Sequence, residues 1–219
     1  MLKHVKISVV MVSVLCLPLL AQRSNSRAGR GYREGADFVM KQLALQEGQV
    51  VVDIGAGDGW WSNQMAQQIG ATGVVHAGEV VQNKVDAIQK TYANTPQIKA
   101  YRCPLDGSGQ PENSCDLIFI SKTYHHLEGH VEYLRHLLQV TKTSGRLAIV
   151  ELHTELASGR GKDHAWKPGL LTQQAEEAGW ILQTYAMIPG SDHFISVFIK
   201  PAFLKKQIEE ALAAASKTS

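Results

Sequence analysis

The sequence predicts an α/β fold in which a largely parallel sheet is covered by helices on both faces. Two observations carry this prediction. Apolar runs that are typical of buried strands alternate with helical segments along most of the chain. The first of these runs also leads straight into a glycine-rich turn, "GAGDG", and then into a helix. This strand–turn–helix arrangement is one in which α/β proteins hold phosphate-bearing or nucleotide-like ligands.

The first half of the chain supplies three strands and two helices. Residues 49–55, "QVVVDIG", are an apolar run of strand length, and 61–70 is a helical segment closed by Gly70. The same alternation continues, with strands expected at 73–80 and 98–104 and a helix at 82–95.

The second half repeats the alternation. A loop rich in Gly, Ser and Pro, residues 105–114, leads into an apolar strand. We expect the remaining strands at 115–121, 146–153, 181–189 and 193–201, the remaining helices at 127–141 and 169–180, and a turn at 142–145. The last two strands are close enough in the sequence to form an antiparallel pair.

The two ends of the chain have a different character. Residues 1–21 combine a short basic start with an apolar run of about 15 residues, fewer than the roughly 20 that span a bilayer. We therefore expect a signal peptide at 1–21, a flexible linker at 22–34, the folded domain at 35–200 and a helical tail at 201–219. Export to the periplasm follows, or a cytoplasmic or membrane-anchored protein if the leader is not cleaved.

Charge excludes some classes of partner. Without Lys3 and Lys6 of the leader, 20 basic side chains balance 20 acidic ones. A neutral chain has no electrostatic footprint for nucleic acid or for an anionic membrane surface. We therefore expect a small-molecule partner, no nucleic acid and no membrane span once the leader is removed; the sequence leaves the oligomeric state open.

The glycine turn has a spacing of its own. Gly55 allows a sharp exit from the strand, and Gly57 and Gly59 allow a ligand to approach the backbone. A dinucleotide fingerprint needs a third glycine where this chain has Trp60, and a phosphate-binding P-loop needs a Gly-Lys-Ser/Thr sequence that is absent.

The stretch "VVDIGAGDG" instead resembles the first motif of the class I S-adenosylmethionine-dependent methyltransferases. The resemblance extends over about residues 30–200, through "SCDLIFISKTYHHL" at 114–127, and is strongest to bacterial small-molecule methyltransferases with a leader. It implies S-adenosylmethionine as cofactor and methyl transfer to an unidentified small molecule. The alternative is an exported, non-catalytic binding domain that retains the fold.

The resemblance also implies which residues bind the cofactor. Asp53 would orient the turn, and Glu79 would accept hydrogen bonds from both ribose hydroxyls. The adenine would meet the backbone of Leu105 or the side chain of Asp106, a choice that the sequence leaves open. The full set of expected cofactor-binding residues is Asp53, Gly55, Ala56, Gly57, Gly59, Glu79, Leu105, Asp106 and Ser121.

The family fold is a doubly wound, Rossmann-like seven-stranded sheet of order 3-2-1-4-5-7-6, with strand 7 antiparallel. In that order two strands separate Cys103, at the end of strand 3, from Cys115, at the start of strand 4. At about 4.8 Å per strand, the two cysteines are too far apart for a disulfide, which needs Cα atoms within about 7 Å. We expect free, buried thiols.

Histidines are the candidate general bases, because imidazole titrates near neutral pH. We expect His125, His126 or His193 to act in this way, and a substrate pocket made by Tyr124, His153, His164 and Trp166 beneath a lid at 157–169. Several histidines and Glu151 have metal-binding chemistry. No two histidines on one predicted helix have the His-x-x-x-His spacing of a helical metal site, so the sequence predicts no metal.

Overall fold

The structure, a computed structural model, describes Arg33 and residues 35–217. The expected signal peptide, and all of the expected linker before Gly35 except Arg33, lie outside the described residues. In the described part of the chain, no helix is both long enough and apolar enough to cross a membrane.

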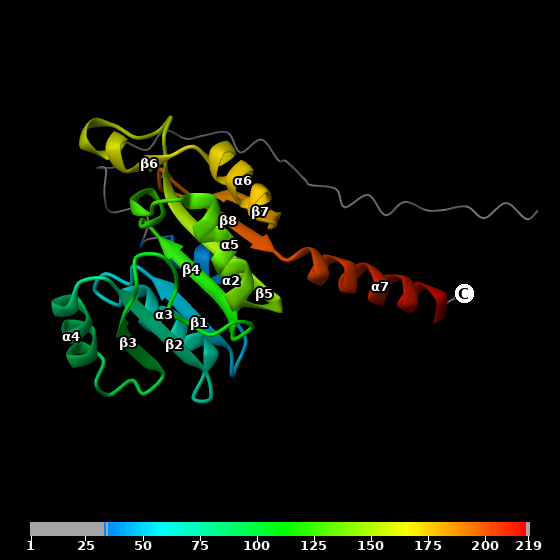
Figure 1. The fold of residues 1–219 in the computed structure, drawn as a ribbon, viewed down its shortest axis with the longest axis horizontal. Helices are drawn as coiled ribbons and strands as arrows, with labels where there is room; N and C mark the ends of the chain where they lie inside the picture. The colour runs from blue at the N-terminus through cyan, green and yellow to red at the C-terminus, as the bar shows by residue number, and fades with distance from the viewer. Residues whose placement is uncertain (1–32, 34, 218–219) are drawn as a thin grey trace, which may run out of the picture.

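One mixed sheet organises the described chain (Figure 1). Its strand order is β3-β2-β1-β4-β5-β8-β7, and β8 is antiparallel to both of its neighbours. A two-residue strand, β6, also pairs with β5. If β6 is left out of the count, this is the predicted order 3-2-1-4-5-7-6, which is confirmed. The strands are β1 Val50–Ile54, β2 Val74–Glu79, β3 Ile98–Arg102, β4 Cys115–Ser121, β5 Thr141–His153, β6 Ala165–Trp166, β7 Ile181–Met187 and β8 His193–Ile199.

Helices cover both faces of this sheet. Val51 of β1 belongs to the core beneath α2 and α3, whereas its neighbour Val52 belongs to the core beneath α5 and α6. Successive strand residues point to opposite faces, so both must be apolar, which explains the unbroken run "VVV". The helices are α2 Ala36–Leu43, α3 Trp60–Ile69, α4 Gln82–Thr91, α5 His130–Val140, α6 Pro168–Glu177 and α7 Pro201–Lys217, with short 3₁₀ helices η1 Tyr124–His126 and η2 Gly159–His164.

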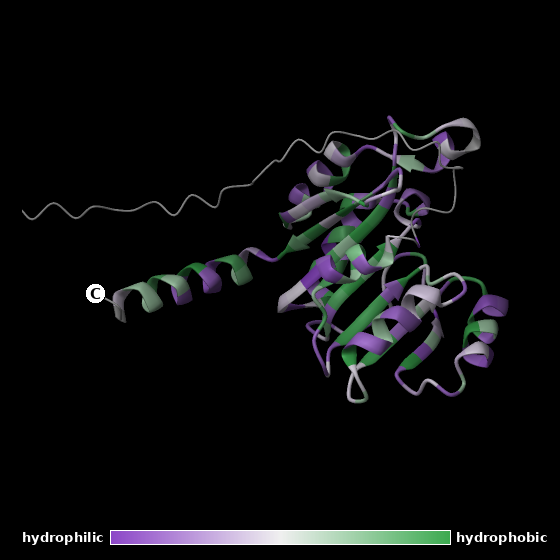
Figure 2. Ribbon diagram, turned by 180° about the vertical axis from the view of Figure 1, so that it is seen from behind, coloured by the Kyte–Doolittle hydropathy of each residue, from purple (hydrophilic) through white to green (hydrophobic). Residues whose placement is uncertain are grey.

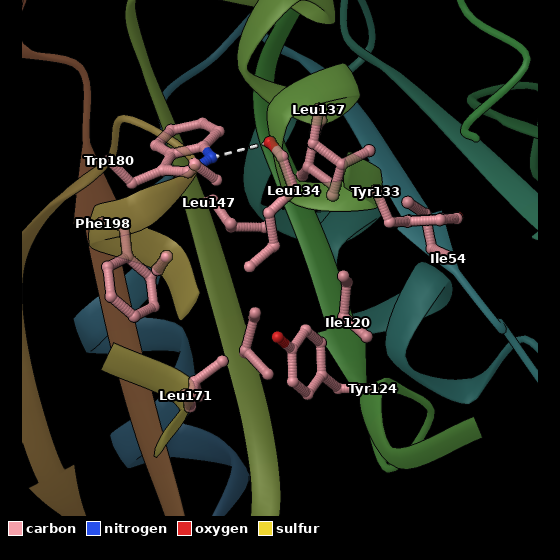
Figure 3. Packing of buried hydrophobic residues seen from close by; sticks show 14 of the residues in the cluster. Ile54, Ile120, Tyr124, Tyr133, Leu134, Leu137, Leu147, Leu171, Trp180 and Phe198 are labelled. Carbon is pink, nitrogen blue, oxygen red and sulfur yellow. Dashed lines mark hydrogen bonds between the residues drawn. The ribbon is translucent and has the colours of Figure 1, made fainter. Parts of the chain in front are cut away.

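The core on the α5 and α6 side is held by large side chains (Figure 3). Trp180 is buried, and its indole Nε1 donates a hydrogen bond of 2.9 Å to the carbonyl oxygen of Leu134 in α5. This bond satisfies the only polar atom of the Trp180 side chain and joins the start of β7 to α5. Figure 2 shows the hydrophobic residues concentrated on the strands in the middle of the molecule.

Three local expectations differ from the structure. The predicted turn at 142–145 lies inside β5, where the partner of β4 moves from Thr141 to Arg146, so these residues bulge out of the ladder. Helix α2 was not expected. The segment 157–169, expected as a lid, contains η2 and β6, and β6 pairs with β5.

Cys103 and Cys115 are both free and buried, as predicted. Cys103 follows β3 and Cys115 begins β4, with β2 and β1 between them in the sheet.

Candidate active site

A cavity of about 900 Å³ lies at the carboxyl ends of β1, β2 and β4. This is the edge at which open α/β sheets bind their ligands, because strand order reverses there. Its lining includes residues 54–58 from the turn after β1, residues 79–80 at the end of β2, residues 103–105 after β3 and residues 121–123 after β4.

The glycine turn forms the floor of the cavity. Gly55, Gly57 and Gly59 all have positive φ angles, of 73°, 63° and 77°. The amide nitrogens of Gly55 and Ala56 both donate to the carbonyl oxygen of Gly78 in β2, at 2.9 and 3.0 Å. A methyl group on Gly57 would meet nothing within 4 Å, so the backbone is open to the cavity at this position.

Glu79 is buried at the end of β2 and lines the cavity. Its Oε1 accepts hydrogen bonds from the Gly57 amide at 3.0 Å and from Lys84 Nζ at 3.2 Å, while Oε2 accepts one from the Val80 amide at 3.1 Å. The carboxylate is thus fixed in place, and its remaining lone pairs can accept from the hydroxyls of a diol. Sequence reasoning missed Lys84, five residues after Glu79 on α4.

Asp53 lies beneath the turn and is not part of the cavity lining. Its Oδ2 accepts a hydrogen bond of 2.6 Å from Ser62 Oγ, which connects β1 to α3. Burial, with a smaller contribution from the charge of Glu79, raises the pKa of Asp53 to about 7. Its contact in the structure is therefore with the helix that follows the turn.

The remaining expected cofactor residues divide into two groups. Ser121 lines the cavity, and its buried Oγ has no hydrogen-bond partner. Leu105 also lines the cavity and is 79% exposed. Asp106 is exposed and lies outside this lining, and Gly59 packs toward Tyr92 of the α4 C-terminus.

Three of the expected histidines meet beside the cavity. One ring nitrogen from each of His125, His126 and His164 lies within 4.8 Å of the others. His125 Nδ1 is 2.9 Å from Oε2 of Glu151, whose side chain is fully buried, and His125 Nε2 is 3.2 Å from His164 Nδ1. Of the three, His126 lines the cavity. Burial, together with His125 and His164, lowers the pKa of His126, so its imidazole is neutral at neutral pH.

The other two histidines lie apart from this cluster. His193 is buried, and its Nδ1 is 2.9 Å from Ser191 Oγ in the turn before β8. Burial lowers the pKa of His193 to about 4. His153 Nδ1 accepts a hydrogen bond from the Glu155 amide. Neither residue lines the cavity.

Tyr124 is a core residue and Trp166 is a half-buried residue packed against that core, and neither is part of the cavity lining. Tyr124 is fully buried among the side chains of Figure 3, and its hydroxyl donates to Gln174 Oε1 at 2.9 Å. Trp166 packs against Tyr124 and His130, with ring centroids 5.4 and 4.7 Å apart. Tyr124 thus belongs to the core beneath α6, and Trp166 covers part of that core.

An ion pair that the sequence did not predict stands at the rim of the cavity. Arg33 donates two hydrogen bonds to the Asp58 carboxylate, at 2.8 and 3.1 Å, and its guanidinium lies 4.9 Å from the centre of the Trp60 ring. Both charged residues belong to the cavity lining. Their separation of 25 residues explains why no local pattern revealed the pair.

Comparison with known proteins finds similar sequences and a similar fold. The sequence model of a family described as "Methyltransferase domain" matches residues 51–145. A demethylmenaquinone methyltransferase from Listeria monocytogenes is 28% identical over 114 residues, which cover 51% of this chain and 48% of that relative. One from Geobacillus kaustophilus is 20% identical over 190 residues, covering 82% and 81%. This chain therefore spans about half the length of the first relative and most of the second.

A solved structure shares the fold. The crystal structure of a SAM-dependent methyltransferase from Aquifex aeolicus superimposes with a TM-score of 0.69 at 22% identity, over 74% of this chain and 87% of that one.

Proposed function

We propose that this chain is a class I S-adenosylmethionine-dependent methyltransferase and that it transfers a methyl group to a small-molecule acceptor. The observation that carries the proposal is the arrangement of Glu79, Gly57 and Ser121 around one cavity. The name shared by the Listeria and Geobacillus relatives supports a small molecule, and the balanced charge of the chain argues against nucleic acid.

The residues present fit this cofactor. Glu79 offers a fixed carboxylate to a ribose diol, Gly57 leaves its backbone uncovered, and Ser121 has a buried hydroxyl that still lacks a partner. A buried hydroxyl left unpaired costs free energy, so a polar ligand atom in the cavity would stabilise it. When bound, the cofactor supplies a methyl group on a positively charged sulfur, which is a good leaving group.

The protein then has two tasks. The turn, Glu79 and the backbone near Leu105 hold the cofactor, and Asp53 keeps the turn in register with α3 through Ser62. Placing the acceptor against the methyl carbon turns a bimolecular reaction into a local one, which is the main source of rate in such chemistry.

The second task is to remove the acceptor's proton. Of the three expected bases, His126 has the best position, because it lines the cavity and is neutral at neutral pH. His125 would support it from the adjacent ring, with a centroid separation of 4.0 Å. His193 is hydrogen-bonded to Ser191 and does not line the cavity, so the geometry favours it less as the general base.

We also propose the organisation expected from the sequence, with a leader at 1–21, a linker at 22–34, a methyltransferase domain at 35–200 and a helical tail at 201–219. Mass spectrometry of the mature chain from periplasmic and cytoplasmic fractions tests this proposal. A start near Gln22 in the periplasm supports export. An intact Met1 in the cytoplasm contradicts it.

The first experiment is calorimetric titration of the chain with S-adenosylhomocysteine. We expect micromolar binding that Glu79→Ala abolishes and that Glu176→Ala, an exposed glutamate on α6, leaves unchanged. A labelled methyl donor then reports transfer to a panel of small thiols, phenols and quinols. His126→Gln should lower kcat while the affinity for S-adenosylhomocysteine stays the same.

No binding to the folded chain would contradict the enzyme proposal. It would leave the alternative of a non-catalytic binding domain that retains this fold.

A further inference from the structure

We propose that His125, His126 and His164 form a binding site for one divalent transition-metal ion of the zinc class, with Glu151 as the carboxylate that orients His125. No spacing in the sequence indicates this site. The three histidines come from η1, which follows β4, and from η2, which is joined to β5 through β6. A separation of 39 residues between His125 and His164 makes the cluster a product of the fold.

The distances suit a shared ion. Two nitrogens bound to one tetrahedral zinc ion, each at about 2.0–2.1 Å, lie roughly 3.3 Å from each other. His125 Nε2 and His164 Nδ1 are 3.2 Å apart. The third nitrogen, from His126, completes a group in which no pair exceeds 4.8 Å. His126 and His164 are exposed, so a small side-chain rotation can bring all three nitrogens to ligand distance.

Glu151 gives the cluster its second feature. Its side chain is fully buried, and both oxygens serve His125, one at 2.9 Å from Nδ1 and the other at 3.3 Å from the backbone amide. A carboxylate accepts hydrogen bonds and does not donate them, so Nδ1 of His125 carries the proton of this contact and Nε2 is the nitrogen left to face an ion. Metal-binding histidines are typically oriented by a carboxylate on their other nitrogen in this way.

The identity of the ligands decides the class of ion. Three neutral imidazoles suit zinc and its neighbours in the first transition row, whereas calcium and magnesium prefer oxygen ligands. Three histidines leave a fourth position open, which is the arrangement of catalytic zinc sites. Because His126 lines the cavity, an ion held by this histidine would lie beside the cavity.

The role of the ion rests on the proposed function. An acceptor thiol or hydroxyl that binds the open position loses its proton to solvent more easily, since the ion stabilises the anion. The lone pair on that sulfur or oxygen then forms the bond to the methyl carbon. The bond from that carbon to the sulfonium sulfur breaks and leaves its electron pair on the sulfur. With the ion bound, His126 is a ligand and not a base.

Metal binding is tested without cofactor. The untagged full chain is stripped with a chelator and titrated with zinc in competition with a chromogenic indicator, and separately with Co²⁺. We expect one zinc ion per chain and the strong visible absorption of four-coordinate Co²⁺. His126→Gln and His164→Gln should each weaken zinc binding at least roughly tenfold, and Glu151→Gln roughly 10- to 100-fold. Mg²⁺ should not compete.

His76→Gln is the matched control, because His76 lies on β2 outside the cluster. It should bind zinc as the unaltered chain does. Circular dichroism confirms that each variant is folded, which the exposure of His126 and His164 favours. Failure of the folded chain to bind zinc, or equal binding by the His126→Gln/His164→Gln double variant, would overturn the proposed site.

Two further measurements separate this proposal from the function. S-adenosylhomocysteine binding is measured on the same samples. If the chain binds zinc but not S-adenosylhomocysteine, the metal site stands and the methyltransferase proposal is contradicted. If it binds S-adenosylhomocysteine but not zinc, only the metal site is contradicted. Benzenethiol or phenol should shift the Co²⁺ spectrum, while methyl phenyl sulfide should not. A Co²⁺ spectrum that changes with neither benzenethiol nor phenol would overturn the role of the ion in acceptor binding.

Discussion

Burial beneath the glycine turn raises the pKa of Asp53 to about 7, from an ordinary value of 3.8. The folded state therefore keeps a proton that the unfolded chain releases. The contribution of this group to stability is fully present below about pH 4, and it is lost as the pH rises through the folded-state pKa near 7.

Asp53→Asn removes this titration while keeping the shape of the side chain. We expect the free energy of unfolding of the unaltered chain, minus that of the variant, to fall as the pH rises from about 4 to about 7 and to be level above that range. Urea denaturation at a series of pH values measures the difference. A profile for Asp53→Asn that runs parallel to that of the unaltered chain would contradict the interpretation.

The histidines show how far sequence reasoning reaches at this scale. Adjacent His125 and His126 could be placed after β4 from the motif that contains them. Their meeting with His164 could not be predicted, because it depends on the pairing of Leu152 with Ala165 between β5 and β6. A two-residue strand has no recognisable pattern of its own. The carboxylate of Glu151, inside an apolar strand, was the one local sign of a buried polar group there.

At the scale of elements, the turn between β1 and α3 contains two glycines, Gly55 and Gly57, whose surroundings differ. Gly55 also has a positive φ, and a side chain there would in addition collide with Thr123, so packing is a second reason for this glycine. A side chain at Gly57 would have open space, so this glycine is required by its positive φ and by the ligand that the cavity accommodates.

Gly57→Ala distinguishes these uses. We expect it to lower the free energy of unfolding by only about 1–2 kcal/mol, the cost of a left-handed conformation for alanine. Calorimetry should show a much larger effect on S-adenosylhomocysteine binding, with at least a tenfold loss of affinity. Gly190→Ala is the control, since Gly190 has a φ of 72° and equally open surroundings outside the cavity. Equal affinities of the two variants would show that the turn does not meet the cofactor.

The order and type of the long elements were predictable because each central strand is buried on both faces. Val51 and Val52 serve opposite cores, so an unbroken apolar run marks such a strand. Helix α2 is short, with 8 residues, and it begins after Gly35 without a side-chain cap, so the sequence carries no start signal for it. The bulge at 142–145 was read as a turn because "KTSG" has turn chemistry, and only the register with β4 shows that the strand begins before it.

At the scale of the whole molecule, α7 stands apart from the rest of the fold (Figure 1). It contacts β5, yet residues 205–216 are exposed. Just before it, Lys200 Nζ donates to the carbonyl oxygens of Leu138 and Thr141, at 3.0 and 2.8 Å. Lys200 therefore ties the start of this segment to the domain.

Deleting residues 207–219 should change the free energy of unfolding by less than about 1 kcal/mol, because exposed residues contribute little. Lys200→Met should lower it by about 1–3 kcal/mol, since two carbonyl oxygens lose a charged donor. Denaturant titration compares the two variants. A large loss on truncation would mean that α7 packs against the domain more extensively than this structure shows.

Cys103 and Cys115, which β1 and β2 separate in the sheet, have a consequence for the compartments in which the chain can fold. Within the described residues, no covalent cross-link has to form before the sheet closes. Folding there needs neither an oxidant nor a disulfide isomerase, so glutathione-rich and oxidising surroundings would give the same product. A targeting sequence at the N-terminus can then be exchanged without any change to the folded domain that follows it.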